Sequence, residues 1–383
     1  MLRASVVGVM GLLLMSADVP TGSYRLPFPA QVYDGLSGNF GEVRPSHWHY
    51  GLDFRVGPNT PIYAVADGYV ARVRVSSGGY GKSVYIRHLN DGHTTVYGHL
   101  SRFSPRIELR IEALQRESQQ FEQEWFPEPG EIVVQAGDLV AYSGNTGYST
   151  GPHLHYEVRD TQEYVLNPLA YHRGVIPDTK PPYLVKLALE PLSAQSRVDG
   201  LFEKLVFTPA GTGPTYTTAE THLVEGPVGL EFTAYDHVGG STNANGVYRT
   251  ELRLDGALIW EQRMDRFGFH HSPSINQHID FGYYQRHRQV LQKAYADSGN
   301  RTPVYPTVVK GGAIELLDNL PHRLELALTD YHGNRSTWRA TLQRGTSRQR
   351  VPTLATDGPG LAPSYSVRRN VLILKSGLPR VLP

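Results

Sequence analysis

The sequence predicts a mainly β protein in which an antiparallel β-sheet groove is followed by a β-sandwich. The 383 residues include 39 glycines, 27 prolines and 23 tyrosines, a composition typical of turn-rich β domains. Short segments with alternating apolar residues recur along the chain and are separated by turn residues. Only one stretch has clear helical spacing. Strands joined by such short turns favour antiparallel pairing.

The strands of the first half are expected at residues 61–66, 68–75, 82–88, 94–99, 139–142 and 153–158. Asp67–Gly68 and the Asn-Asp-Gly sequence at residues 90–92 are typical of tight hairpin turns, so we expect a hairpin at each. A further turn is expected at residues 144–147. These turns imply an open sheet or a small barrel.

One helical insertion, residues 104–126, interrupts the strands. Ser104 is a capping residue and Pro105 suits the first turn. Apolar residues follow at helical spacing: Ile107, Ile111, Leu114, Phe121 and Trp125. Pro127 and Pro129 are expected to end the helix. It either packs on the sheet or forms a wall or lid beside a substrate groove.

The chain divides into four expected parts. They are a signal peptide (1–17), a first domain (21–175), a β-sandwich domain (176–345) and a tail with one possible strand (346–383). Prolines and polar residues near Pro181–Pro182 mark the linker between the domains. Within the sandwich, Tyr235–Asp236 and Thr329–Asp330 each end an apolar strand, a faint internal repeat.

Charge and cysteine content exclude several classes of function. The formal net charge is +1 and the isoelectric point is about 8.0, so no global basic field indicates nucleic-acid binding. Cysteine is absent, which excludes disulfides, cysteine catalysis and thiolate zinc sites.

The N-terminus has the pattern of a secretory signal. Arg3 precedes an apolar run over residues 4–15, and Ser16 and Ala17 follow. The alternative is a hydrophobic first strand or helix. We expect export to the periplasm, cell envelope or extracellular space, with no stable membrane span after signal removal.

Histidines and one aspartate carry the chemistry. His153 and His155 share one face of a strand, and His49 and Asp53 lie upstream. In a straight strand His49 and Asp53 would be about 13 Å apart, so the chain must bend, and Gly51 permits a bend. Two histidines and one acid, with a fourth position for water, form a hydrolytic zinc arrangement.

On this reasoning His49, Asp53 and His155 are candidate ligands of one Zn²⁺ per chain. His99 and His153 are left for a second role. Imidazole suits the transfer of a proton from an activated water to a leaving amine. Which of the two takes the proton is not specified by the sequence, and no substrate-binding residue is indicated.

Five motifs occur together, at residues 40–44 (FGEVR), 49–53 (HYGLD), 97–100 (YGHL), 145–147 (NTG) and 151–155 (GPHLH). In this order they resemble the lysostaphin/LytM-type zinc endopeptidases of the bacterial cell wall, over about residues 24–171. The resemblance implies a duplicated-hybrid-motif type of β groove, zinc, and cleavage of peptidoglycan stem peptides or cross-bridges. By position, it assigns His49, Asp53 and His155 as ligands and His99 and His153 as catalytic.

The sequence departs from this pattern in two places. The segment of residues 104–129 is longer than the usual link between the motifs, which affects the shape of the groove. In addition, His47 is a rival metal ligand close to His49. The second domain resembles immunoglobulin-like sandwiches only in pattern, and a wall or envelope protein is a possible partner for it.

Two other functions stay open. One is a non-catalytic wall-binding protein or activator of another wall hydrolase, and the other is a zinc peptidase acting on non-wall proteins. Because no site residue lies beyond the linker, we expect a chain ending near Asp178 to fold, bind zinc and cleave soluble muropeptides.

Overall fold

The computed structural model describes residues 24–172, 174–300, 302–345, 364–368 and 371–375. Contacts group the chain into one compact unit that ends at Gly345 and a second that begins at Thr346. The expected signal peptide lies outside the described residues. The expected domain boundary at residue 175 lies inside the first unit and stays a prediction.

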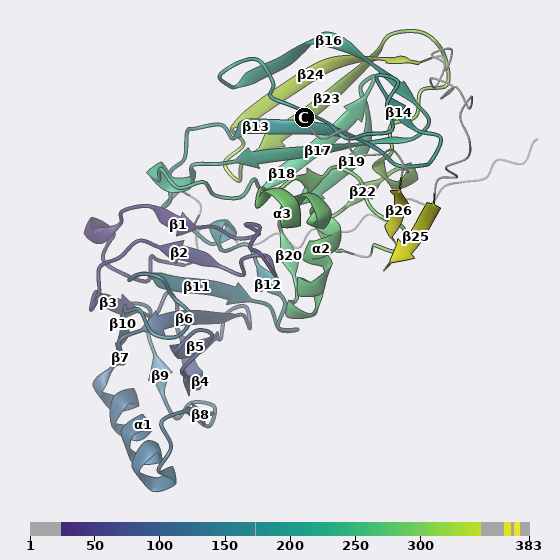
Figure 1. The fold of residues 1–383 in the computed structure, drawn as a ribbon. Helices are drawn as coiled ribbons and strands as arrows, with labels where there is room; N and C mark the ends of the chain where they lie inside the picture. The colour runs from purple at the N-terminus through teal and green to yellow at the C-terminus, as the bar shows by residue number, and fades with distance from the viewer. Residues whose placement is uncertain (1–23, 173, 301, 346–363, 369–370, 376–383) are drawn as a thin grey trace, which may run out of the picture. The chain divides into compact units, whose positions relative to one another are not determined.

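The first half of the chain is built on one large sheet (Figure 1). Its strands run in the order β1 (Leu36–Gly38), β2 (Leu52–Phe54), β11 (Leu154–Arg159), β6 (Thr94–Leu100), β5 (Lys82–His88), β4 (Gly68–Val75) and β8 (Gln123–Trp125). Two short strands, β9 (Val133–Val134) and β12 (Val165–Leu166), pair with β4 and β11. The pairings between these strands are antiparallel, as expected.

A smaller sheet joins β3 (Pro61–Tyr63), β10 (Leu139–Tyr142) and β7 (Arg102–Phe103). The hairpin expected at Asp67–Gly68 is therefore wrong, because β3 and β4 belong to different sheets. Gly68 has another role: a Cβ there would collide with the carbonyl oxygen of Arg87 on β5. The hairpin expected at residues 90–92 is confirmed between β5 and β6, with Gly92 at φ +69°.

Helix α1 (Pro105–Ser118) starts as expected after Ser104 and ends earlier than expected. Gln119 adopts a left-handed conformation with φ 55°, and the chain then forms β8, which pairs Trp125 with Val73 of β4. Phe121 and Trp125 are thus not helical. Ile107 and Ile111 are buried in the core of the first half, so the helix packs on the sheet rather than covering a groove.

The second half contains two further sheets. One has the order β15 (Leu205–Phe207), β13 (Tyr183–Pro191), β17 (Val228–Tyr235) and β21 (Gln292–Lys293). The other has the order β14 (Arg197–Val198), β16 (Thr215–Glu225), β24 (Arg335–Arg344), β23 (His322–Thr329), β18 (Arg249–Leu254), β19 (Ala257–Arg263) and β22 (Thr307–Val308). Both sheets contribute to one apolar core, which includes Phe232 and Trp338, so the arrangement is a β-sandwich. One pair, β16 with β24, is parallel.

Short helices complete the first unit. They are η1 (Ala30–Val32), η2 (Pro168–Ala170), η3 (Val238–Gly240), η4 (Phe269–Ser274), α2 (Ile275–His278), α3 (Phe281–His287) and η5 (Lys310–Gly312). In the second unit, β25 (Ser364–Arg368) and β26 (Val371–Lys375) form an antiparallel hairpin. No helix in the described part of the chain has the length and apolar content needed to cross a bilayer.

The two halves of the first unit share a core. Strand β20 (Arg266–Phe267) pairs with β12, as Figure 1 shows. Around this pair lies an apolar cluster that draws on both halves of the sequence: Phe40, Trp48, Val165, Met264, Phe267, Ile275 and Val304. A chain ending near Asp178 would expose the first three of these side chains to water. This exposure would destabilise the first half on its own. The expectation that the first half folds independently therefore requires its remaining core to offset that cost.

His172 gives the folded state a pH dependence. It is 1% exposed, its ring lies 5.3 Å from that of Tyr156, and neither ring nitrogen has a hydrogen-bond partner. Burial lowers its pKa to about 3. Between pH 6.5 and 3 the unfolded chain therefore binds a proton that the folded chain does not, and stability falls as pH falls, by up to about 1.4 kcal/mol per pH unit.

We expect His172→Leu to reduce the slope of the unfolding free energy against pH by the equivalent of about one bound proton. The measurement is urea unfolding at several pH values between 4 and 7, and His287→Leu, at an exposed position of α3, is the matched control. Equal slopes in all three proteins would contradict the assignment.

Candidate metal centre and groove

Three neighbouring strands bring the predicted site residues together. Asp53 lies on β2, and the pairing of β2 with β11 places it directly opposite His155. The pairing of β11 with β6 places His155 opposite Gly98, next to His99. His49 lies three residues before β2 and still reaches Asp53, so the expected departure from a straight strand is confirmed.

Gly51 is needed for a reason other than the expected bend. A Cβ at this position would collide with the carbonyl oxygen of Tyr156 on β11. The glycine therefore permits close approach of the two chain segments. That approach holds His49 and Asp53 against His155.

Asp53, His49 and His155 form a buried cluster. The Oδ1 atom of Asp53 lies 2.8 Å from Nδ1 of His155 and 3.0 Å from Nε2 of His49. The two nitrogens are 3.2 Å apart. One ligand atom from each residue lies within 4.8 Å of the others, so the three side chains could hold a metal ion. The rival His47 is outside this group: its ring stacks on Tyr50 at 5.6 Å.

The hydrogen bonds on the outer side of the cluster fit a metal ion at its centre. His49 donates from Nδ1 to the carbonyl oxygen of Asn39 at 2.8 Å, and His155 donates from Nε2 to Oε1 of Glu157 at 3.0 Å. Each ring thus turns its other nitrogen inward, the arrangement that orients metal-ligating histidines. Arg44 lies 3.4 Å from Oδ2 of Asp53 and leaves Oδ1 to the histidines.

Electrostatic interactions at this centre favour the charged forms of Asp53 and His155. Burial alone would raise the pKa of Asp53, but His49, His153 and His155 hold it well below its usual range. Burial alone would lower the pKa of His155, but Asp53 and Glu157 raise it to about 9. At neutral pH the cluster without an ion therefore keeps a proton on His155, which a metal ion would have to displace.

Glu157, Tyr80 and Arg159 support His155. Glu157 is fully buried; it accepts hydrogen bonds from the hydroxyl of Tyr80 and, at 2.7 Å, from Nε of Arg159. Burial would raise the pKa of Glu157, but Arg159 and His155 lower it to about 2. The ring of Tyr80 also stacks on that of His155, with centroids 4.9 Å apart.

These three supporting residues were not predicted from the sequence. A signal for two of them exists in the alternation of β11, where Leu154, Tyr156 and Val158 join the core. Glu157 and Arg159 therefore share a face with His155.

His99 and His153 lie beside the cluster, with ring centroids 4.7 Å apart. Each donates from Nδ1 to a backbone carbonyl at 2.8 Å, His99 to Thr146 and His153 to Gly151. Nε2 of His153 is 3.5 Å from Oδ1 of Asp53. Burial and the neighbouring His155 and His153 lower the pKa of His99 to about 4, so its ring is neutral at pH 7.

These side chains line a groove of about 670 Å³. The remaining lining comes largely from loops of the first half, but Phe269 and Ser272 come from η4 in the second half. The ring of Phe269 lies 4.2 Å from that of Tyr50, and Ser272 hydrogen-bonds to the hydroxyl of Tyr50. The second half of the chain therefore contributes to the lining of the groove, although the five predicted site residues all lie in the first half.

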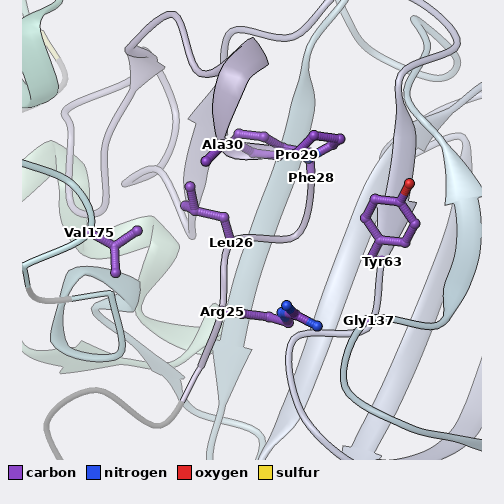
Figure 2. Close-up of a pocket in the computed structure, with 8 residues that line it drawn as sticks. All are labelled: Arg25, Leu26, Phe28, Pro29, Ala30, Tyr63, Gly137 and Val175. Carbon is purple, nitrogen blue, oxygen red and sulfur yellow. The ribbon is translucent and has the colours of Figure 1, made fainter.

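A second hollow of about 640 Å³ lies in the first half (Figure 2). It is lined by Arg25, Leu26, Phe28, Pro29, Ala30, Tyr63, Gly137 and Val175. Arg25 is the charged residue among them, and it donates to the carbonyl oxygen of Ala136 at 3.1 Å. This lining lacks a cluster of acids or histidines, so the histidine-lined groove is the candidate site.

Two inward-facing imidazoles, one carboxylate and two further histidines in a groove have the donor set of a metallohydrolase. Comparison with known families agrees: residues 47–116 and 128–168 match the model of peptidase family M23. These stretches are therefore similar to a peptidase family M23 domain. The gap in the match, residues 117–127, covers the end of α1 and strand β8.

Several known proteins are similar to this domain. An uncharacterized metalloprotease of Haemophilus influenzae is 40% identical over 117 residues, which are 30% of this chain and 19% of that protein. The DD-carboxypeptidase/endopeptidase Mpg of Neisseria meningitidis is 37% identical over 133 residues, which are 33% of this chain and 25% of that protein. The chain thus spans about a fifth to a quarter of the length of these relatives.

Among solved structures, the catalytic domain of the prophage-encoded M23 protein EnpA from Enterococcus faecalis, solved as a point mutant, is 28% identical. The match covers 39% of this chain and 96% of that domain, with a TM-score of 0.28.

Proposed function

We propose that this chain is an exported zinc metalloendopeptidase that hydrolyses peptide bonds in bacterial peptidoglycan. The observation that carries the proposal is the convergence of His49, Asp53 and His155 at one point of a groove that His99 and His153 also line. The match to peptidase family M23 supports peptide hydrolysis. The N-terminal pattern, with a basic residue before an apolar run, supports export.

The wall substrate rests on the resemblance of the motifs and on the names of relatives. Besides Mpg, these include a glycyl-glycine endopeptidase of Staphylococcus capitis, 33% identical over 110 residues. The periplasm or cell envelope follows as the site of action, because peptidoglycan lies there. The sandwich would then position the enzyme on the wall or bind an envelope protein.

In this proposal His49 through Nε2, His155 through Nδ1 and Asp53 through Oδ1 hold one zinc ion. When bound, zinc polarises a carbonyl oxygen and lowers the pKa of water. Glu157 positions His155 through its hydrogen bond to Nε2. Arg44 positions Asp53 by contacting the oxygen that faces away from the histidines.

The two remaining histidines handle protons. Because His99 and His153 both use Nδ1 to donate to a backbone carbonyl, each keeps Nε2 to accept or return a proton. Hydrolysis needs one proton removed from the attacking water and one delivered to the leaving amine. Tyr50 and Phe269 form an aromatic wall on the groove, which offers apolar surface to a bound peptide.

The test is digestion of isolated peptidoglycan by the purified chain with and without a chelator, followed by mass analysis of the fragments. We expect soluble fragments with new peptide termini only without chelator, and recovery when zinc is added back. Casein, incubated in parallel, controls for a peptidase of non-wall proteins. Wall binding without fragments from the zinc-loaded chain would contradict the proposal and favour an activator.

A further inference from the structure

A second cluster of metal-ligating side chains lies away from the groove, where the linker meets the sandwich. Asp178 belongs to the segment between η2 and β13, and Asp330 and His332 belong to the turn between β23 and β24. One ligand atom from each of the three lies within 4.8 Å of the others. The cluster shares no residue with the groove.

A further acid lies beside the cluster. Asp236, at the end of β17, is 1% exposed. Burial, followed by the charges of Asp178 and Asp330, raises the pKa of Asp236 to about 8. The two strand-end aspartates of the faint sequence repeat, Asp236 and Asp330, therefore lie near a common point together with the linker aspartate.

Several buried polar atoms around this point have no hydrogen-bond partner. They are Oδ2 of Asp178, Nδ1 of His332, and both Oδ1 and Nδ2 of Asn245. Asn245 is 0% exposed, and two backbone hydrogen bonds of 2.9 Å pair it with Asp236. Residues paired in this way project their side chains to the same side, so the Asn245 amide lies on the same side as the Asp236 carboxyl group.

His332 is oriented as a ligand would be. Its Nε2 donates to the carbonyl oxygen of Ile176 at 2.7 Å, which leaves a lone pair on Nδ1. A hydrogen bond from the other ring nitrogen to a carbonyl is the usual support of a metal-ligating histidine. The bond also ties the sandwich turn to the linker.

Turn formation explains only part of the cluster. Asp330 accepts hydrogen bonds from the backbone N–H groups of His332 and Asn334, each at 2.8 Å, and so stabilises its own turn. That role leaves the unpartnered atoms of Asp178, Asn245 and His332 unexplained. Unpaired buried polar atoms are costly, and those of Asp178 and His332, two of the three cluster residues, indicate a missing partner.

We propose that Asp178, Asp330 and His332 bind a divalent cation, with Asp236 and Asn245 beside it. The donors are mainly carboxylate and amide oxygens with one imidazole, which favours a cation that prefers oxygen ligands, such as Ca²⁺ or Mn²⁺. The ion would fasten the linker to the turn between β23 and β24. It would therefore stabilise the junction between the two halves of the first unit.

The experiment uses the full chain, stripped of metal and then supplied with one equivalent of Zn²⁺ to occupy the groove site. Ca²⁺ and Mn²⁺ are titrated in turn by calorimetry, and thermal unfolding is recorded at each endpoint. We expect one further ion to bind and the unfolding temperature to rise, because a ligand of the folded state stabilises it. Asp178→Asn should weaken binding at least about tenfold, since it removes a charged ligand.

Glu220→Gln, at an exposed position of β16, is the matched control and should bind as the unaltered chain does. Asp178 is half-buried in the linker, and equal unfolding temperatures of the metal-free variant and parent would show that Asp178→Asn folds. Absence of a second ion, or undiminished binding by Asp178→Asn, would overturn the proposal. Binding of a second Zn²⁺ but neither Ca²⁺ nor Mn²⁺ would overturn the assignment to an oxygen-preferring cation.

Discussion

His155→Ala is expected to abolish zinc binding and, with it, hydrolysis. His155 supplies the inner nitrogen nearest to Asp53, at 2.8 Å, and its loss leaves one imidazole and one carboxylate. Two protein ligands do not complete the three-ligand shell of a catalytic zinc site. The measurement is zinc content per chain after dialysis, with about one zinc expected in the unaltered protein.

The matched control is His47→Ala. His47 lines the groove and is two residues from His49, but it is not part of the ligand cluster. This variant should keep its zinc. Because His155 also bonds to the buried Glu157, a circular-dichroism spectrum must show that His155→Ala is folded. An undiminished zinc content in folded His155→Ala, or a loss of zinc from His47→Ala, would contradict the ligand assignment.

The site residues could be predicted because each lies in a short local motif, although their convergence depends on strand pairing. The motif around His155 has the alternation of a strand, and the backbone pairing of β11 with β2 then sets Asp53 opposite His155. The same alternation places Glu157 beside His155, so this supporting acid was within reach of sequence reasoning. The roles of the five residues stay proposals.

Features that depend on distant segments were not predictable in this way. The local sequence suggested a hairpin at Asp67–Gly68, but β3 pairs with β10, which lies far along the chain. The expected helix continued to Trp125, whereas the pairing of Trp125 with Val73 draws that segment into the sheet. A local pattern cannot report such pairings because the stabilising partner lies elsewhere.

The wall of the groove likewise could not be predicted from local sequence patterns. Phe269 and Ser272 lie far from Tyr50 in the sequence, and no periodicity connects them. The shared core around Trp48 and Phe267 brings them there. The proline content that marks the expected linker therefore gave no indication that residues of the second half line the groove.

His153→Ala is expected to keep zinc but lose turnover by roughly 10²-fold or more, the scale of general acid–base catalysis. His153 is not one of the three residues whose ligand atoms lie within 4.8 Å of one another. The residue lines the groove, with Nδ1 committed to the carbonyl of Gly151. Removing the ring therefore removes a proton carrier beside His99 without opening the metal shell.

The measurements are zinc content and the rate of cleavage of a soluble muropeptide across pH. His287→Ala, at an exposed position of α3, is the control and should match the unaltered chain in both. Loss of a proton carrier should also remove one limb of the pH–rate profile, which a merely structural defect would leave in place. Near-normal turnover would assign His153 a structural role, and lost zinc would place it among the ligands.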